Sequence, residues 1–268
     1  MDPETRNAAL SGTLSPGLCS VTLRSHSVDD VAALAAEAGL AGIEWGSDVH
    51  VPDAAAAARA RKACANAGLR VLSLGSYYRA GTFGDFEATL ALAAGIGAPR
   101  VRIWAGSLEP HEADAGTWAA VVEDTRRIAA LAAGQGVELA FEFHNRSLTS
   151  TVEGTLELLG RVARPNVGTY WQPAVGVSDA EALDALRSLL PRLMGIHCFS
   201  WWPQAERLPL DAREDLWREA LAIARSSGRD LDVMLEFVAD DSPEILLRDA
   251  ATLRRWIGAL QAARSGAV

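Results

Sequence analysis

Short apolar runs alternate with longer helical patterns along almost the whole chain. Between the runs, apolar residues recur at three- and four-residue spacing, as in residues 28–38 and 118–133, which predicts helices that pack by one face. The apolar runs predict eight strands, at residues 17–22, 42–45, 70–74, 100–104, 139–143, 167–171, 193–198 and 233–237. Expected helix ends are the glycines Gly39, Gly68, Gly95, Gly136 and Gly228.

Eight strand–helix units without a break in composition predict one α/β domain with a parallel sheet and right-handed crossovers. The doubly wound alternative lacks its signature, because no GxGxxG follows the first strand and no GxxxxGK[ST] occurs in the sequence. We therefore expect a single (β/α)8 TIM barrel over residues 15–268. Residues 1–14 are expected to form a flexible polar tail, without the basic start and apolar stretch of a signal peptide.

Composition excludes several classes of function. The net charge of −9 argues against nucleic acid as a partner, and no apolar run is long enough to predict a membrane span. Three widely spaced cysteines form no CxxC pair, which is typical of reduced thiols in a cytoplasmic protein. The one lysine, Lys62, lies in a predicted helix and is expected to face water. Schiff-base chemistry needs a buried lysine, so this position argues against it.

Four polar residues stand at or directly after the carboxyl ends of predicted strands: Glu142, Gln172, His197 and Glu236. The carboxyl ends of barrel strands form one face, where the active sites of such barrels lie, so we expect these side chains to converge. Two carboxylates, an amide oxygen and an imidazole are suitable ligands for one divalent metal ion. The carboxylates Glu142 and Glu236 could also carry protons to and from a substrate.

Further polar and aromatic residues lie near the same strand ends and are candidates for binding a substrate. Arg102 is the candidate least easily explained as a purely structural residue, because an arginine inside a strand needs an anionic partner. Aromatic faces suit the C–H faces of sugars and other polyols, although some of these rings are expected to serve only as packing. The candidates are His50, Tyr77, Arg102, Trp104, His144, Trp171, Trp201 and Arg207.

These strand ends resemble the sugar phosphate isomerase/epimerase family with the xylose isomerase-like TIM barrel. The resemblance spans nearly the whole chain. It rests on Gly-Ile-Glu-Trp-Gly-Ser-Asp-Val-His-Val-Pro from Gly42, Arg-Ile-Trp-Ala-Gly from Arg102, Glu-Phe-His from Glu142, His197, and Glu-Phe-Val-Ala-Asp-Asp-Ser-Pro-Glu from Glu236. It implies one ion of Mn²⁺, Mg²⁺, Co²⁺ or Zn²⁺, held by residues on strands five to eight. Glu142, His197 and Glu236 match that ligand set.

The chain departs from the family pattern at three positions. Gln172 stands where the family usually has an aspartate ligand, Val175 replaces a paired histidine, and Ser200 replaces an aspartate after strand seven. Loss of one carboxylate reduces the negative charge of the ligand set from three to two, which weakens affinity for a hard cation.

The resemblance implies a metal-dependent isomerase or epimerase that acts on a ketose or related hydroxy-ketone through an enediolate. A dehydratase acting on a keto-polyol is an alternative, because the same enediolate can expel a β-hydroxyl. A barrel that only binds a sugar or polyol is a second alternative, favoured by the three departures. The expected partner is a small, unphosphorylated sugar or polyol, and the resemblance also suggests a homodimer or homotetramer.

Overall fold

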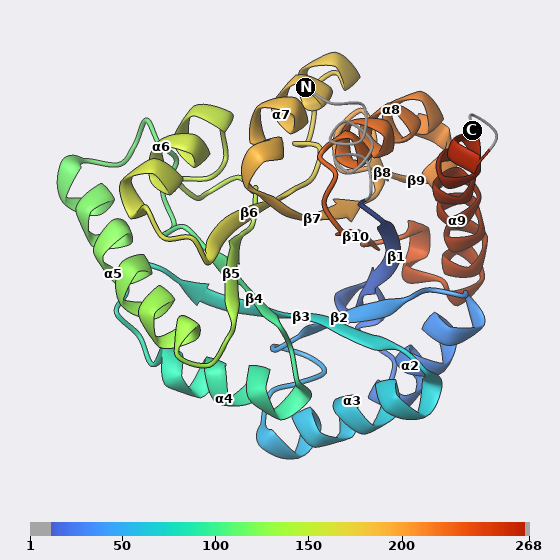
Figure 1. Ribbon diagram of the computed structural model, residues 1–268, viewed down its shortest axis with the longest axis horizontal. Helices are drawn as coiled ribbons and strands as arrows, with labels where there is room; N and C mark the ends of the chain where they lie inside the picture. Colours follow the sequence, from blue (N-terminus) through green and yellow to red (C-terminus); the bar gives the residue numbers. More distant parts are fainter. Residues whose placement is uncertain (1–11, 266–268) are drawn as a thin grey trace.

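A closed barrel of eight parallel strands forms the centre of the molecule, and helices surround it (Figure 1). The computed structural model describes residues 12–265, and their side chains as far as residue 262. The strand order around the barrel is β1-β10-β7-β6-β5-β4-β3-β2. The predicted (β/α)8 barrel is therefore confirmed. Most of the predicted tail, residues 1–11, lies outside the described residues.

Each barrel strand is followed by at least one helix in the described chain. The strands are β1 Leu14–Cys19, β2 Gly42–Gly46, β3 Arg70–Arg79, β4 Arg100–Trp104, β5 Glu138–Phe141, β6 Val167–Trp171, β7 Leu193–Cys198 and β10 Leu231–Leu235. The α-helices are α2 Val28–Glu37, α3 Ala54–Ala67, α4 Phe86–Ile96, α5 Ala115–Ala133, α6 Val152–Val162, α7 Asp179–Leu189, α8 Glu214–Ser226 and α9 Pro243–Ser265. A short hairpin, β8 Ser200–Trp201 and β9 Arg207–Leu208, follows β7, and short 3-10 turns are η1 Ser20–Leu23, η2 Leu190–Arg192, η3 Leu210–Arg213 and η4 Ala239–Asp241.

Local sequence signals explain where most of these elements begin and end. Ser27 caps α2 through a capping box with Asp30, which satisfies backbone N–H groups that the first helical turn leaves free. Several expected boundaries were wrong. The first strand begins earlier than predicted, at Leu14, and it ends at Cys19 because the next residues turn into η1. The strand expected at residues 233–237 is Leu231–Leu235, and the strand expected at 70–74 continues to Arg79. Gly95 lies inside α4, and Gly97 (φ 76°) ends that helix in the left-handed conformation that glycine adopts without steric cost.

Strand alternation points one set of side chains into the barrel and the other set towards the helices. On β7, Gly195 and His197 face the interior, where Tyr170 of β6 packs edge-on against the His197 ring at 5.0 Å between centroids. Tyr170, Leu72 and Met234 belong to a small apolar cluster inside the barrel. The larger apolar cluster lies between strands and helices. The interior is therefore packed, and polar groups gather towards the carboxyl ends of the strands.

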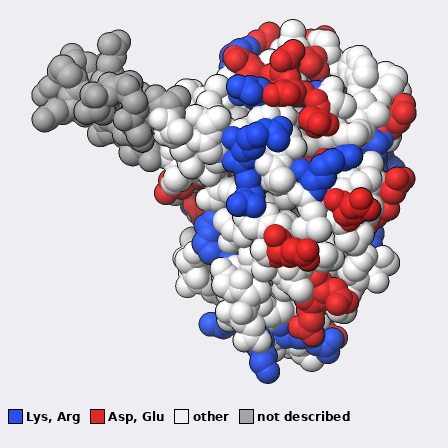
Figure 2. Space-filling model, turned by 90° about the vertical axis from the view of Figure 1, so that its right-hand side faces the viewer, with Lys and Arg blue, Asp and Glu red and all other residues white. Residues whose placement is uncertain are grey.

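The outer surface carries charges of both signs. On the face at the right of Figure 1, acidic and basic side chains are interspersed (Figure 2). None of the helices within residues 12–265 combines the length and the hydropathy that a membrane span requires.

Candidate metal and proton-transfer site

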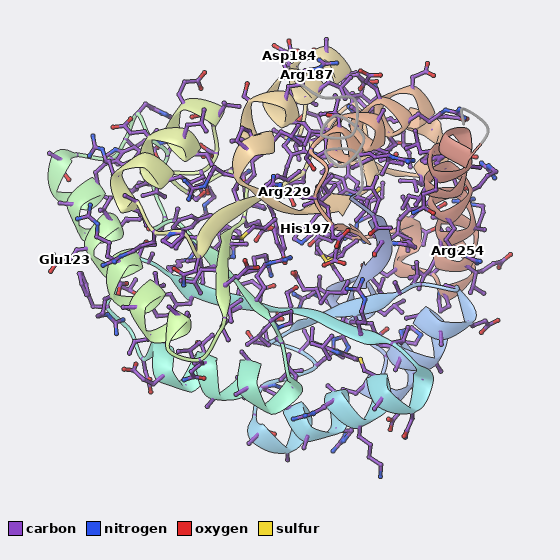
Figure 3. All side chains as sticks on the ribbon, viewed as in Figure 1. Glu123, Asp184, Arg187, His197, Arg229 and Arg254 are labelled. Atoms are coloured by element: carbon purple, nitrogen blue, oxygen red, sulfur yellow. The ribbon has the colours of Figure 1, made fainter. Side chains whose placement is uncertain are left out.

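The four predicted ligands meet at the carboxyl end of the barrel. His197 lies in the barrel interior, whereas Glu123, Asp184, Arg187 and Arg254 lie at the periphery (Figure 3). Its Nδ1 is 3.0 Å from Gln172 Oε1 and 3.6 Å from Glu236 Oε2. Ligand atoms of Glu142, His197 and Glu236 lie within 4.8 Å of one another, and all three residues are buried. The convergence expected from the strand ends is therefore present.

The donor set fits a divalent cation. Two carboxylates and an amide oxygen suit hard ions, and the imidazole suits Mn²⁺, Co²⁺ or Zn²⁺ as well. Burial of Glu142 and Glu236, at 3% and 5% exposure, is costly unless a cation compensates their charge. Glu142 pairs with Arg102, but the cation nearest Glu236 is His197, and only when His197 is protonated. A bound ion would compensate Glu236 and leave His197 neutral.

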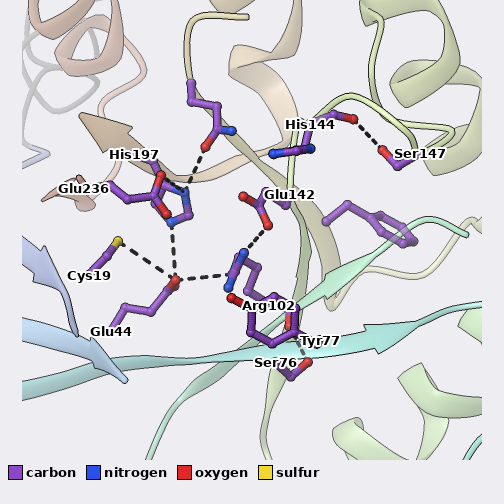
Figure 4. Close-up of polar contacts among 12 residues, drawn as sticks. Cys19, Glu44, Ser76, Tyr77, Arg102, Glu142, His144, Ser147, His197 and Glu236 are labelled. Carbon is purple, nitrogen blue, oxygen red and sulfur yellow. Dashed lines mark hydrogen bonds and ion pairs between the residues drawn. The ribbon is translucent and has the colours of Figure 1, made fainter. Parts of the chain in front are cut away.

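A third buried carboxylate, Glu44 of β2, lies behind this group (Figure 4). Its Oε1 is 3.3 Å from His197 Nε2 and 3.3 Å from Arg102 Nε. Arg102 also forms an ion pair with Glu142. The anionic partner expected for Arg102 is therefore a pair of carboxylates, and Arg102 lies beneath the cavity instead of lining it.

The charges within this network shift the pKa values of its members. Burial alone would raise the pKa of Glu44, but the charges of His197 and Arg102, with a hydrogen bond from Ser73, lower it to about 2. Burial would lower the pKa of His197, but Glu236 and Glu44 raise it to about 9. Burial raises the pKa of Glu236. In the absence of a metal ion, His197 therefore carries a proton at neutral pH.

A cavity of about 370 Å³ is lined by three of the four candidate ligands, Glu142, Gln172 and Glu236. Its polar wall consists of Glu142, His144, Asn145, Ser150, Gln172 and Glu236. Its apolar wall includes Phe143, Val175, Phe199, Trp201 and Phe237. Neither lysine nor arginine is among the described residues that line it. A small molecule with polar groups on one side and an apolar face on the other would fit this division.

Of the predicted substrate-binding residues, His144 and Trp201 line this cavity, and Trp104 and Arg207 pack next to them. His144 lines it and packs against Trp104 at 4.5 Å between ring centroids. Tyr77 stacks on Trp104, with 6.5 Å between the ring centroids, and is 43% exposed. Trp201 lines the opposite wall, and the Arg207 guanidinium lies 5.7 Å from its ring while pairing with Asp241.

Two predicted substrate-binding residues lie away from the cavity. Trp171 is fully buried and packs against Trp217 of α8, because the neighbouring Tyr170 occupies the inward-facing position of β6. His50 is also buried, and its ring nitrogens lie 3.0 Å from Ser20 Oγ and 3.2 Å from the His26 carbonyl oxygen. Both side chains serve packing or loop structure in the described chain.

Glu44 was not among the residues singled out from the sequence. The available signal was strand parity, since Gly42, Glu44 and Gly46 alternate with the apolar Ile43 and Trp45. A carboxylate between two buried apolar residues of a strand points into the barrel. The reasoning that required an anionic partner for Arg102 could have led to it.

The chain belongs to the xylose isomerase-like TIM barrel family, whose model matches residues 32–256. Members of this family include epimerases and a dehydratase. A curated relative, the 3-dehydroshikimate dehydratase of Bacillus anthracis, is 26% identical over 199 residues, which are 67% of this chain and 69% of the relative.

Solved structures share the fold at low sequence identity. The probable 3-DHS dehydratase AsbF of Bacillus anthracis superposes with a TM-score of 0.72 at 20% identity, over 90% of this chain and 98% of that one. A D-psicose 3-epimerase determined in the presence of D-fructose gives 0.67 at 17% identity, over 91% and 99%. A xylose isomerase-like protein of Mycobacterium smegmatis in complex with magnesium gives 0.69 at 14% identity, over 91% and 97%.

Proposed function

We propose that this protein is a divalent-metal-dependent isomerase or epimerase of a small hydroxy-ketone. The observation that carries the proposal is the convergence of Glu142, His197 and Glu236, whose ligand atoms lie within 4.8 Å of one another. Glu142 and Glu236 also line a cavity. The magnesium complex of a structural neighbour supports a divalent ion in such a barrel. Gln172 supplies a fourth candidate ligand atom, the amide oxygen Oε1, beside His197.

The two glutamates are suited to move a proton across a substrate. Glu142 follows β5 and Glu236 follows β10, and strands β6 and β7 separate them in the barrel. A bound divalent ion would polarise the substrate carbonyl and make the adjacent C–H more acidic. One carboxylate takes that proton, which leaves an enediolate. The other returns a proton to the opposite face, which is epimerisation, or to the neighbouring carbon, which is isomerisation.

The walls of the cavity favour an uncharged substrate. Phosphate groups are usually held by arginine, lysine or backbone N–H groups, and the described lining contains neither basic residue. Arg207 at the rim is already paired with Asp241. Aromatic residues such as Trp201 and Phe237 can cover a C–H face, while His144 and Asn145 can bind hydroxyl groups. A free ketose or keto-cyclitol has these features.

Dehydration of a keto-polyol is a second candidate, favoured by the curated relative, which is a 3-dehydroshikimate dehydratase. The first step is the same, because a base must remove the proton beside the carbonyl. The outcomes diverge when the second carboxylic acid protonates a β-hydroxyl, which leaves as water, instead of protonating carbon.

Isotope exchange tests the shared step and product analysis separates the two candidates. The manganese-loaded protein would be incubated in D2O with free ketoses, keto-cyclitols and 3-dehydroshikimate. We expect NMR to show deuterium beside the carbonyl of the substrate or product. An epimer or isomer without new ultraviolet absorption supports the first candidate. A new absorbing enone from a ketose or keto-cyclitol, or an aromatic product from 3-dehydroshikimate, supports dehydration. If the metal-loaded protein exchanges no hydrogen in any of these compounds, the proposed proton transfer is wrong.

Metal affinity should rise with pH. The pKa of His197 in the metal-free protein is raised from its ordinary 6.5 to about 9, so a proton competes with the metal for the ring nitrogen. Raising the pH removes that competitor. Between pH 7 and 9 we expect Mn²⁺ affinity to increase about tenfold per pH unit, because one proton is displaced for each ion bound. Calorimetry at pH 7.5 in buffers of different ionisation enthalpy should show release of about one proton. A pH-independent affinity would contradict this protonation state.

A further inference from the structure

Glu44 is a buried carboxylate that the proposed proton transfer does not use. It is 3% exposed, it stands on β2, and it is not among the residues that line the cavity. An ionised carboxylate in such a position is costly unless its neighbours compensate the charge. Its contacts therefore indicate what it does for the site.

One oxygen of Glu44 faces two nitrogen atoms that have no better acceptor. Oε1 is 3.3 Å from both His197 Nε2 and Arg102 Nε. Neither nitrogen has a well-aligned hydrogen-bond partner among the described residues. The other oxygen, Oε2, accepts a 2.6 Å hydrogen bond from Ser73 Oγ, which holds the carboxylate in place.

The contact with His197 lies on the far side of the ring from the candidate metal position. Nδ1 faces Gln172 Oε1 and Glu236 Oε2, whereas Nε2 faces Glu44 (Figure 4). A histidine that binds a cation through Nδ1 must carry its proton on Nε2. A carboxylate at Nε2 favours that tautomer, fixes the orientation of the ring and makes Nδ1 a better donor to the metal.

Glu44 also acts on Glu142, because Arg102 contacts both carboxylates. Arg102 turns Nε towards Glu44 and Nη1 towards Glu142, so Glu44 fixes the guanidinium that pairs with a proposed proton-transfer residue. Gly75 of β3 makes room for this arrangement. A Cβ atom there would lie 3.0 Å from Glu44 Oε1 and 3.0 Å from Arg102 Nη2.

The charges balance when Glu44 is counted. Glu44, Glu142 and Glu236 contribute three negative charges, and Arg102 contributes one positive charge. A divalent ion with neutral His197 brings the group to neutrality. Without Glu44 the buried group would carry an excess positive charge, which weakens cation binding.

We propose that Glu44 is a positioning residue that orients His197 as a metal ligand and Arg102 as the partner of Glu142. This inference rests on the metal site of the proposed function. The competing interpretation is a second cation held by Cys19, Glu44 and His197, whose ligand atoms also lie within 4.8 Å of one another. The Arg102 charge, 3.3 Å from the same Glu44 oxygen, opposes a cation there.

Metal binding measured with Mn²⁺ alone tests this role without any substrate. In Glu44→Gln, which keeps the shape and removes the charge, we expect the dissociation constant to rise about 10- to 100-fold. Glu44→Asp, which keeps the charge on a shorter side chain, should lose less affinity and serves if the glutamine variant does not fold.

The matched control is Asp232→Asn. Asp232 also pairs with barrel arginines, Arg70 at 3.0 Å and Arg100 at 3.9 Å, but stands at the amino end of β10. It should bind Mn²⁺ as the wild type does.

Wild-type affinity in both Glu44 variants would overturn the positioning role. A second equivalent of metal that disappears in Cys19→Ala would also overturn it, because Glu44 would then be a ligand. The His197 Nε2–H signal in NMR spectra of the metal-free protein separates failure of this inference from failure of the metal site. If the wild type binds no metal but shows a low-field, slowly exchanging signal that Glu44→Gln abolishes, the proposed function fails while Glu44 still orients the ring. Absence of that signal in the wild type would overturn the contact itself.

Discussion

Replacement of Glu236 or Glu142 by glutamine should lower turnover by about a hundredfold or more in each case, with the fold retained. The amide has nearly the same shape as the carboxylate but cannot accept a proton. Both side chains line the cavity and both are buried, so water has little room to replace them as a base. Steady-state rates on the substrate identified by isotope exchange provide the measurement.

Glu142→Gln and Glu236→Gln should also differ from each other in the substrate proton that they can no longer transfer. If the enzyme is an epimerase, each variant should retain solvent exchange with one epimer and lose it with the other. Metal content must be measured in parallel, because both glutamates are candidate ligands as well. Glu138→Gln is the matched control, since Glu138 lies at the amino end of β5 and its side chain is 47% exposed. Near-normal rates in Glu142→Gln or Glu236→Gln would contradict the acid–base roles.

Substitution of His197 by alanine should abolish tight metal binding. The wild type is expected to hold about one divalent ion per chain, whereas His197→Ala loses the nitrogen that lies between Gln172 and Glu236. Elemental analysis of protein purified without chelator measures this directly. Activity should fall with the metal content and should not return when excess Mn²⁺ is added.

A surface histidine provides the control for this experiment. His111→Ala, at an exposed position, should retain the wild-type metal content. Equal metal content in His197→Ala and the wild type would mean that the ion binds elsewhere. If the wild-type protein takes up no metal even when excess Mn²⁺ is added, metal-assisted chemistry in this barrel is contradicted.

The barrel and the convergence of its ligands could be predicted because both follow from regular geometry. Eight apolar runs separated by amphipathic helices leave few topologies, and residues that end parallel strands share one face. Glu142, Gln172, His197 and Glu236 were found by that rule. Their proposed roles rest on chemistry and still await the experiments above.

Features that depend on strand parity and loop conformation were harder to predict. Trp171 is the last residue of β6 and directly precedes Gln172, yet it faces the helices, because adjacent strand residues point in opposite directions. The loop that carries His50 folds back onto η1. Glu44 lies inside a strand instead of at its end, so a search confined to strand ends passes over it.

The hairpin formed by β8 and β9 contributes to the cavity from outside the barrel strands. Trp201 contributes to the cavity wall from this hairpin, and the Arg207–Asp241 ion pair ties the hairpin to η4. The proposed proton-transfer groups follow β5 and β10, and their buried supports, Glu44 and Arg102, stand on β2 and β4. Sequence changes in the hairpin can therefore reshape the wall without moving those groups. Under the proposed function, the hairpin is therefore a segment in which substrate preference can change while the proposed proton-transfer groups stay in place.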